Sequence, residues 1–131
     1  MKLPSEEKIW MNYYPKEIQN LQIPNCSLSN YLKINMNNLD DTCIKFYGEN
    51  ITYKKLFETS NKVAKALVSL NVNKNSQIPV FLEATPSFLM ILLGIEQLGA
   101  SIVCRDGTLE EEVEVIKKAN AKIIFVHDDL D

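Results

Sequence analysis

The fold is decided by one stretch of the chain, QIPVFLEATPSFLMILLGIEQLGASIVC, which spans residues 77–104. Its first part, Ile78 to Leu82, is a short apolar run that predicts a strand. Thr85 and Pro86 then give an N-cap followed by proline at the first helical position, a combination that starts helices. From Phe88 to Ile95 the predicted helix is apolar on nearly every face, which is typical of a buried helix.

A second strand is predicted at the end of this stretch, and a second helix and a third strand follow it. Gly99 is expected to cap the first helix, and Ser101 to Cys104 is the second strand. Thr108-Leu109-Glu110-Glu111 is a capping box, which opens a helix that closes on Lys117-Lys118 in agreement with the helix dipole. Lys122 to Val126 is the third strand. Two consecutive strand-helix-strand crossovers of this kind are right-handed and give a parallel sheet.

A hairpin and an amphipathic helix are predicted upstream. Cys43 to Tyr47 alternates apolar and polar residues, and Gly48-Glu49-Asn50 supplies turn chemistry. Thr52 is placed to cap a helix of about five turns. The apolar face of this helix recurs at Leu56, Ser60, Val63, Leu67 and Leu70. Asn71 and Asn75 are expected at its exit, because asparagine tolerates the left-handed conformation found there.

Two short helices are predicted before the hairpin. Ser5 to Tyr14 forms the first, which Pro15 stops, and Pro15 to Asn25 is predicted as an extended connector. The second begins near Ser27 and precedes a polar break at Asn37 to Asp41. Because neither helix has much to bury alone, we expect both to wrap around the rest of the chain.

Length and composition indicate one domain of the α/β class. With 131 residues, 46% of them apolar, the chain is long enough for a core and too short for two domains. We divide it into a helical lead-in (1–42), a hairpin with an amphipathic helix (43–76) and a parallel strand-helix-strand-helix-strand unit (77–131). The predicted fold is a β-hairpin plus a short parallel sheet with crossover helices, as one partial domain.

Charge, hydropathy and cysteine content argue against several kinds of protein. A net charge of -3 predicts no nucleic-acid partner, which requires clustered lysine and arginine. The start, Met1 to Glu7, does not resemble a signal peptide, and no apolar run approaches the roughly 18 residues of a transmembrane helix. Three cysteines without C-x-x-C spacing predict neither a disulfide framework nor a zinc site. We therefore expect a soluble, cytoplasmic protein.

Ligands of a parallel sheet bind beyond the carboxyl ends of its strands. Here those ends are Glu83-Ala84-Thr85 and the loop from Cys104 to Thr108. In that loop Gly107 permits close backbone approach, Thr108 starts a helix with free amides, and Arg105 has the charge to pair with a phosphate or carboxylate. One glycine and one arginine are a weak signal, so a plain turn with a solvated arginine is the favoured interpretation.

His127 with Asp128, Asp129 and Asp131 has the chemistry of metal ligands. An adjacent run of this kind at a polar terminus does not preorganise convergent ligands, so we interpret it as a polar end after the last strand. Cys104 lies at a strand end without a second histidine to activate it, which argues against a nucleophile.

Acidic and aromatic clusters are open to structural explanations. Glu110-Glu111-Glu112 is interpreted as a charged first helical turn. Trp10, Tyr13 and Tyr14 form an aromatic contact surface or pack in a core or an interface, and the sequence leaves both alternatives open.

Several short motifs follow one another along nearly the whole chain. They are Trp10 with Tyr13-Tyr14-Pro15, Ile23-Pro24 and Ser27-Leu28; Ile51-Thr52-Tyr53-Lys54-Lys55-Leu56 with Ala64 and Leu67; Asn71-Val72, Lys74-Asn75-Ser76 and Ile78-Pro79-Val80; and Leu93-Gly94-Ile95-Glu96-Gln97-Leu98-Gly99-Ala100. Their order and spacing resemble the N-terminal region of the adenylate-forming (AMP-binding) enzyme superfamily, of the acyl-CoA synthetase and nonribosomal peptide synthetase adenylation-domain type.

This resemblance implies an ATP-dependent ligase that joins a carboxylic acid to AMP and then to a thiol. ATP, magnesium and coenzyme A or carrier-protein pantetheine are implied for the full-length enzyme. The family's phosphate loop, nucleotide-contacting acids and catalytic lysine lie in later sequence, so no residue here is assigned a catalytic, cofactor-binding or metal-binding role. Asn71 and Asn75 replace usual glycines, and Cys104 to Gly107 stands where a proline-containing loop is common. The acyl substrate is left open.

The resemblance predicts an N-terminal fragment that is inactive alone and has the remainder of the same enzyme as its partner. The alternative is a stand-alone, non-catalytic protein-interaction module. The helix from Phe88 to Ile95 discriminates between them, because an exposed outer face would need a homodimer or another partner to cover it. A small flavodoxin-like nucleotide or phosphate sensor is disfavoured because no cluster of acids occupies the strand ends.

Overall fold

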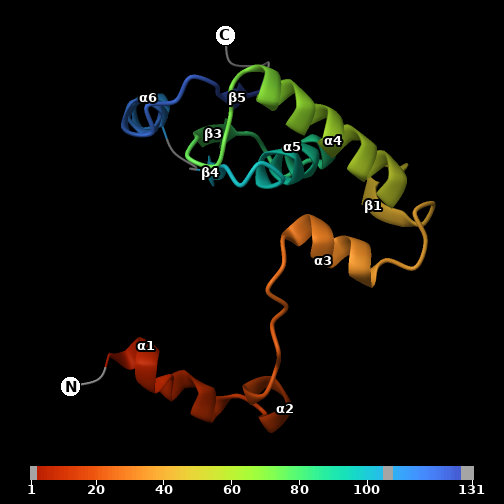
Figure 1. The fold of residues 1–131 in the computed structure, drawn as a ribbon, viewed down its shortest axis with the longest axis vertical. Coiled ribbons are helices and arrows are strands. Elements are labelled where there is room, and N and C mark those ends of the chain that lie inside the picture. Colours follow the sequence, from red (N-terminus) through yellow and green to blue (C-terminus); the bar gives the residue numbers. More distant parts are fainter. Residues whose placement is uncertain (1–2, 105–107, 128–131) are drawn as a thin grey trace.

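A computed structural model describes residues 3–104 and 108–127, and it contains two small sheets surrounded by helices (Figure 1). The larger sheet consists of β3 (Gln77–Phe81), β4 (Ser101–Val103) and β5 (Phe125–Val126) in the order β4-β3-β5. The central strand pairs in parallel with both neighbours. The predicted parallel sheet is confirmed, although β5 is shorter than the predicted strand at 122–126 because only its last two residues pair with β3.

Helices cover both faces of this sheet. In Figure 1, α4 (Tyr53–Ser69) and α5 (Pro86–Glu96) lie to the right of the three strands and α6 (Leu109–Lys118) lies to their left. Side chains alternate between the two faces of a strand, and all four residues from Ile78 to Phe81 are buried. Both faces of β3 are therefore covered, as expected for the middle strand of a parallel sheet.

The main core joins α4, α5 and β3. Its buried members are Leu67, Ile78, Val80 and Ile95. Gly94 lets the two helices approach closely, because a Cβ there would lie 2.7 Å from Val63 Cγ1 and 2.9 Å from the carbonyl oxygen of Ser60. No residue from Phe88 to Ile95 is exposed. The expected burial of this apolar helix is confirmed, and the helix does not itself require a partner to cover it.

The hairpin packs beside the N-terminal half of α5. It consists of β1 (Thr42–Phe46) and β2 (Glu49–Thr52), which pair antiparallel. The turn lies one residue earlier than predicted: its central residues are Tyr47 and Gly48, with φ of 45° and 87°, whereas Glu49 already belongs to β2. Positive φ at both positions is the geometry of the tight turn that matches the twist of two strands.

Hydroxyl caps start the helices where the sequence predicts them. Ser27, Thr52, Thr85 and Thr108 each accept a hydrogen bond from the backbone amide three residues later. Asn71 has the left-handed φ of 63° expected after α4, but Asn75 does not adopt it. Instead the backbone amide of Asn75 donates to Asn73 Oδ1 at 2.9 Å within the loop.

The lead-in differs from its prediction. The expected helix at Ser5 to Tyr14 is two pieces, α1 (Pro4–Glu7) and the 3₁₀ helix η1 (Ile9–Tyr13), because Lys8 breaks the run with a left-handed φ of 47°. The expected connector contains α2 (Lys16–Gln19), which Pro15 starts at its N-cap. None of these three elements has a buried residue, so the expectation that the first predicted helix wraps around the rest is wrong.

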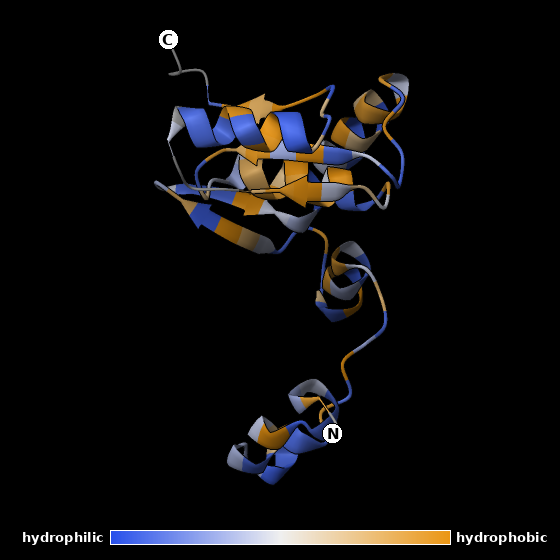
Figure 2. Cartoon of the chain, turned by 90° about the vertical axis from the view of Figure 1, so that its left-hand side faces the viewer, coloured by the Kyte–Doolittle hydropathy of each residue, from blue (hydrophilic) through white to orange (hydrophobic). Residues whose placement is uncertain are grey.

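The residues at 3–25, which we call the lead-in arm, stand apart from the body of the molecule (Figure 2). The next helix, α3 (Leu28–Asn35), does dock on the body through Glu96 at the end of α5. Glu96 accepts hydrogen bonds from the Leu28 amide at 2.8 Å and from Ser29 Oγ at 2.7 Å. This carboxylate therefore holds the start of α3 against α5.

Among the helices that the structure describes, none combines the length and the apolar character needed to cross a membrane.

Candidate functional site

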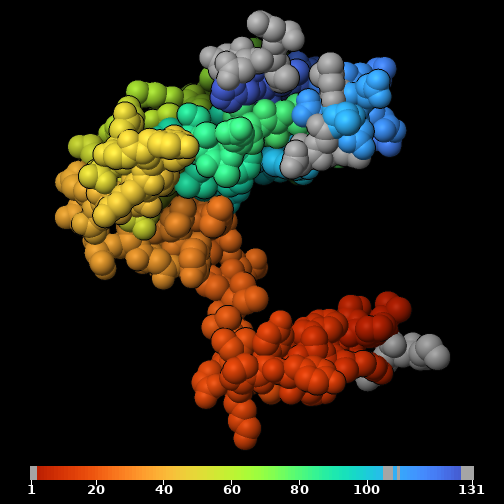
Figure 3. Space-filling view, turned by 180° about the vertical axis from the view of Figure 1, so that it is seen from behind, coloured from red at the N-terminus to blue at the C-terminus, as the bar shows by residue number. Residues whose placement is uncertain are grey.

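A groove lies at the carboxyl edge of the parallel sheet, between the hairpin, the start of α5 and β5. We call it the hairpin groove, and its volume is about 560 Å³. Its apolar wall is formed by Phe46, Ile51, Leu82, Pro86, Met90, Ile91, Phe125 and Val126, and its polar residues are Glu49, Thr85, Ser87 and His127. The hairpin and α5 lie side by side on the face shown in Figure 3. This is the edge at which parallel sheets bind ligands.

The structure brings together two residues that the sequence analysis considered as parts of separate sites. Thr85, from the end of the first strand segment, and His127, from the end of the third, line the same groove. Thr85 Oγ1 accepts from the Phe88 amide at 3.3 Å, so part of the helix terminus is already satisfied by its own cap. The three aspartates predicted beside His127 lie outside the described residues. Within 3–104 and 108–127, no group of three potential metal ligands comes together.

The second predicted strand end offers fewer groups for binding an anion than its sequence suggested. Arg105 and Gly107 lie outside the described residues, while Thr108 uses its free groups in the capping box. The amide of Thr108 donates to Glu111 Oε2 at 3.0 Å, and the Glu111 amide donates back to Thr108 Oγ1 at 3.4 Å. These two amides are therefore engaged within the helix and are not free for an anion.

Cys104, at the same strand end, shows no sign of activation. Although the residue as a whole is exposed, desolvation by neighbouring protein atoms raises the pKa of its thiol from the ordinary value of 9.0. A raised pKa lowers the thiolate fraction at neutral pH, and the thiolate is the reactive form. The residue therefore lacks the electrostatics of a nucleophile.

The acids at Glu110 to Glu112 occupy the first turn of α6, as predicted. Further along this helix Lys118 Nζ lies 2.7 Å from Glu114 Oε1, one helical turn away. This arrangement is that of a solvated helix face with charges matched to the dipole.

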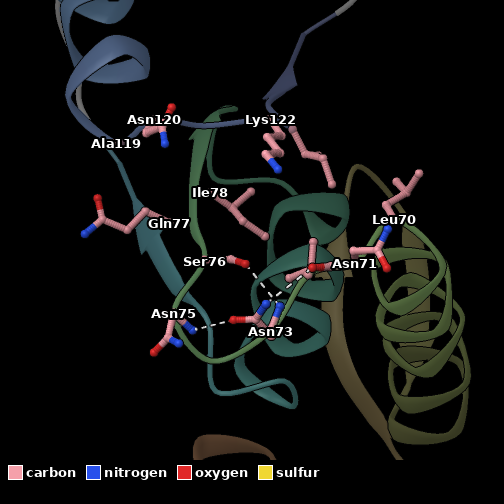
Figure 4. Close-up of a pocket in the computed structure, with 12 residues that line it drawn as sticks. Leu70, Asn71, Asn73, Asn75, Ser76, Gln77, Ile78, Ala119, Asn120 and Lys122 are labelled. Atoms are coloured by element: carbon pink, nitrogen blue, oxygen red, sulfur yellow. Dashed lines mark hydrogen bonds between the residues drawn. The ribbon is translucent and has the colours of Figure 1, made fainter.

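A second pocket, of about 310 Å³, lies at the opposite, amino edge of the sheet (Figure 4). The loop after α4 and the turn after α6 line it, and its polar residues include Asn71, Asn73, Asn75, Asn120 and Lys122. A hydrogen bond within the loop stabilises it, since the backbone amide of Asn73 donates to Ser76 Oγ at 3.0 Å. The asparagines at 71–75 are a sequence signal for this pocket, but the sequence analysis used them as a helix ending and as part of the family resemblance, not as a pocket.

The aromatic cluster of the lead-in arm belongs to no core. Trp10, Tyr13 and Tyr14 are 46, 86 and 49% exposed. Core packing, one of the two alternatives for these residues, is therefore excluded within this chain.

The geometry defines a parallel α/β sheet with a hairpin beside its carboxyl edge. The family model described as "AMP-binding enzyme" matches residues 33–131, and the chain belongs to this family. The resemblance noted from the motifs is thus confirmed.

Particular relatives come from both branches named by that resemblance. Bacitracin synthase 1 of Bacillus licheniformis is 31% identical over 91 residues, which cover 68% of this chain and 2% of that protein. Acetyl-coenzyme A synthetase of Dictyostelium discoideum is 26% identical over 100 residues, covering 70% of this chain and 15% of that protein. The crystal structure of the anthranilate CoA ligase AuaEII, in complex with anthranoyl-AMP, superposes with a TM-score of 0.73 at 20% identity. That match covers 82% of this chain and 22% of AuaEII, and at 20% identity it shows a similarity of fold alone. This chain spans only a small part of its relatives' length.

Proposed function

We propose that this chain is the N-terminal part of an ATP-dependent adenylate-forming ligase. In the complete reaction a substrate carboxylate attacks the α-phosphate of ATP, pyrophosphate leaves and an acyl-adenylate forms. A thiol of coenzyme A or of a carrier-protein pantetheine then attacks the acyl carbon, and AMP leaves. The proposal places the protein in the cytoplasm and makes the remainder of the enzyme its structural partner.

The observation that carries this proposal is the family match over residues 33–131. The fold supports it, because 82% of this chain superposes on the anthranilate CoA ligase AuaEII with a TM-score of 0.73. Since the chain spans 2 to 15% of bacitracin synthase 1 and acetyl-coenzyme A synthetase, we assign the chemistry to sequence outside it.

Residues 1–131 would act as one partial domain that supplies scaffold and a wall of the acyl or thiol site. Within the described residues no group of three potential metal ligands comes together, and Gly48, Gly94 and Gly99 are isolated positions rather than a phosphate-binding run. We therefore assign no catalytic, cofactor-binding or metal-binding residue and route no step through these groups. The wall we propose is the hairpin groove.

Hydroxylamine trapping tests the proposed reaction. The longest product of this reading frame is incubated with ATP, magnesium, hydroxylamine and a panel of carboxylic acids. Formation of a hydroxamate with one acid class, dependent on ATP, supports the ligase and identifies its substrate. Absence of any hydroxamate from a folded long product across the panel overturns it.

The exposed aromatic side chains of the lead-in arm favour a second candidate, a protein-interaction module. A module predicts that the 131-residue chain binds a protein partner in the absence of ATP, carboxylate or thiol. Carboxylate-dependent ATP-pyrophosphate exchange by the long product would count against this candidate.

A further inference from the structure

We propose that the pocket at the amino edge of the sheet binds a small polyol phosphate, a molecule of the size and chemistry of glycerol phosphate. This amino-edge pocket lies opposite the hairpin groove, so the site is separate from the proposed ligase reaction. Its ligand would contact both the loop after α4 and the turn after α6, which are far apart in the sequence.

The pocket lies where the pairing between β3 and β5 stops. β5 pairs only at Phe125 and Val126, and continuation of the same register would place Lys122 opposite Gln77. These two described residues do not pair. Pro79, in the central strand, has no amide hydrogen to donate to a neighbouring strand, which favours an early end to the pairing. A cavity of about 310 Å³ remains between the two segments.

Side-chain amides supply the hydrogen-bonding groups of the pocket. Four of them form no hydrogen bond with other described residues, and they belong to Asn71, Asn75, Gln77 and Asn120. The Asn73 side chain differs, because its Oδ1 accepts from the Asn75 backbone amide at 2.9 Å. An amide group can both donate and accept hydrogen bonds, and so can a hydroxyl. Several such amides around one pocket therefore favour a ligand with several hydroxyl groups.

The charge of the pocket favours an anionic group on the same ligand. Among the described residues that line it, Lys122 alone is charged, and no ion pair joins it to the rest of the described chain. Figure 4 shows Lys122 across the pocket from the loop that carries Asn71 and Asn73. The segments 70–78 and 117–123 contain four lysines and no acid, in a chain with a net charge of -3. Because lysine is a common phosphate ligand, we place the phosphate at Lys122.

The helix ends beside the pocket are compatible with an anion. The C-terminus of a helix repels negative charge, chiefly through its unpaired carbonyl groups. Here a left-handed asparagine follows each helix, Asn71 with φ of 63° after α4 and Asn120 with φ of 47° after α6. In both cases the next backbone amide donates back to a carbonyl oxygen near the helix end, at 3.0 Å in α4 and 3.2 Å in α6. Lys117 and Lys118 also offset the dipole of α6.

The volume of the pocket limits the size of the ligand. About 310 Å³ is at the lower end of the range of about 300–1,000 Å³ for pockets that accept small molecules. Val72, Ile78 and Ile123 line the pocket beside its polar groups and can contact the carbon atoms of a short polyol. The polar lining residues are mostly exposed, so we expect a dissociation constant of about 1 mM.

An NMR titration of the ¹⁵N-labelled 131-residue chain tests the proposal. Glycerol phosphate, inorganic phosphate and glycerol are added separately to about 20 mM at constant ionic strength, roughly twenty times the expected dissociation constant. We expect saturable shifts with glycerol phosphate, confined to residues 70–78 and 119–123, and binding of inorganic phosphate about fivefold weaker because the hydroxyl contacts are missing. No saturation with glycerol phosphate, equal binding of inorganic phosphate or of glycerol, or shifts centred on the hairpin groove overturns the proposal.

Three variants assign the binding to individual residues. Lys122→Gln removes the charge of an exposed side chain and should raise the dissociation constant by about tenfold or more, as for a hydrogen bond to a charged group. Asn120→Gly removes one amide, and glycine accepts the left-handed φ of 47°, so the fold should be kept while binding weakens about fivefold. Lys62→Gln is the matched control, since Lys62 is exposed on α4 outside the pocket. Equal affinities of Lys122→Gln and Lys62→Gln contradict the proposal, provided that the spectra of both show the native fold.

Discussion

Glu96→Ala is expected to detach α3 from the body without unfolding the sheet. The carboxylate of Glu96 accepts a hydrogen bond from Ser29 Oγ at 2.7 Å and one from the Leu28 amide at 2.8 Å, while the Ser29 amide lies further away at 3.4 Å. Ser29 is only 2% exposed, so its hydroxyl would lose its partner in a buried position. The first amides of α3 would also lose their acceptor.

The magnitude follows from these contacts. The buried hydroxyl bond to a charged acceptor is worth about 1.5 kcal/mol, the exposed amide bond about 0.5–1 kcal/mol, and the contact at 3.4 Å adds little. An acid at the C-terminus of α5 is unfavourable to that helix by about 0.3–0.5 kcal/mol, which the substitution regains. The loss is larger than the gain, so Glu96→Ala should lower the free energy of unfolding by about 1.5–2 kcal/mol.

Urea unfolding and amide hydrogen exchange measure the two parts of this prediction. Glu58→Ala is the control, because Glu58 is an exposed acid on α4, and such a change is expected to stay within about 0.5 kcal/mol. Exchange in Glu96→Ala should accelerate in α3 before it does in β3. Equal stability of the two variants, or unchanged protection of α3, would refute the role given to this carboxylate.

Three further changes test the packing, the caps and the thiols. Gly94→Ala should destabilise the protein by about 1–2 kcal/mol, because overpacking against Val63 exceeds the gain of about 1 kcal/mol in helix propensity; thermal unfolding checks this, and an unchanged melting temperature contradicts it. Thr52→Ala removes the cap of α4 and should cost about 0.5–2 kcal/mol in urea unfolding, whereas Thr52→Ser should retain most of the stability. Burial raises the pKa of the Cys43 thiol, so its alkylation by iodoacetamide should become half-maximal above pH 9.0. By linkage the protonated thiol favours the folded state, and this contribution falls as pH rises past the ordinary value; half-maximal labelling below pH 9.0 would contradict the assignment.

The central α/β unit could be predicted because its signals are local. Four hydroxyl caps and the left-handed Asn71 are set by chemistry within a few residues, and the structure places them as expected. The apolar character of α5 likewise predicted its burial without knowledge of its neighbours.

The lead-in and the hairpin turn were harder because local propensity competes with backbone strain. Lys8 and Tyr47 adopt positive φ although neither residue type favours it, so no local signal indicated the break or the exact turn position. The hairpin groove depends on long-range packing, because Thr85 and His127 line the same groove only when β3 and β5 pair. The spacing of these two residues along the chain does not indicate that they line one groove.

ATP-pyrophosphate exchange tests the central claim most directly. The purified 131-residue chain and the longest product of its reading frame are compared at equal concentration, with the carboxylic acid identified by hydroxamate trapping. The account predicts carboxylate-dependent exchange by the longer product and none by the 131-residue chain. Exchange by the 131-residue chain alone would contradict it, because the adenylating groups would then lie within these residues.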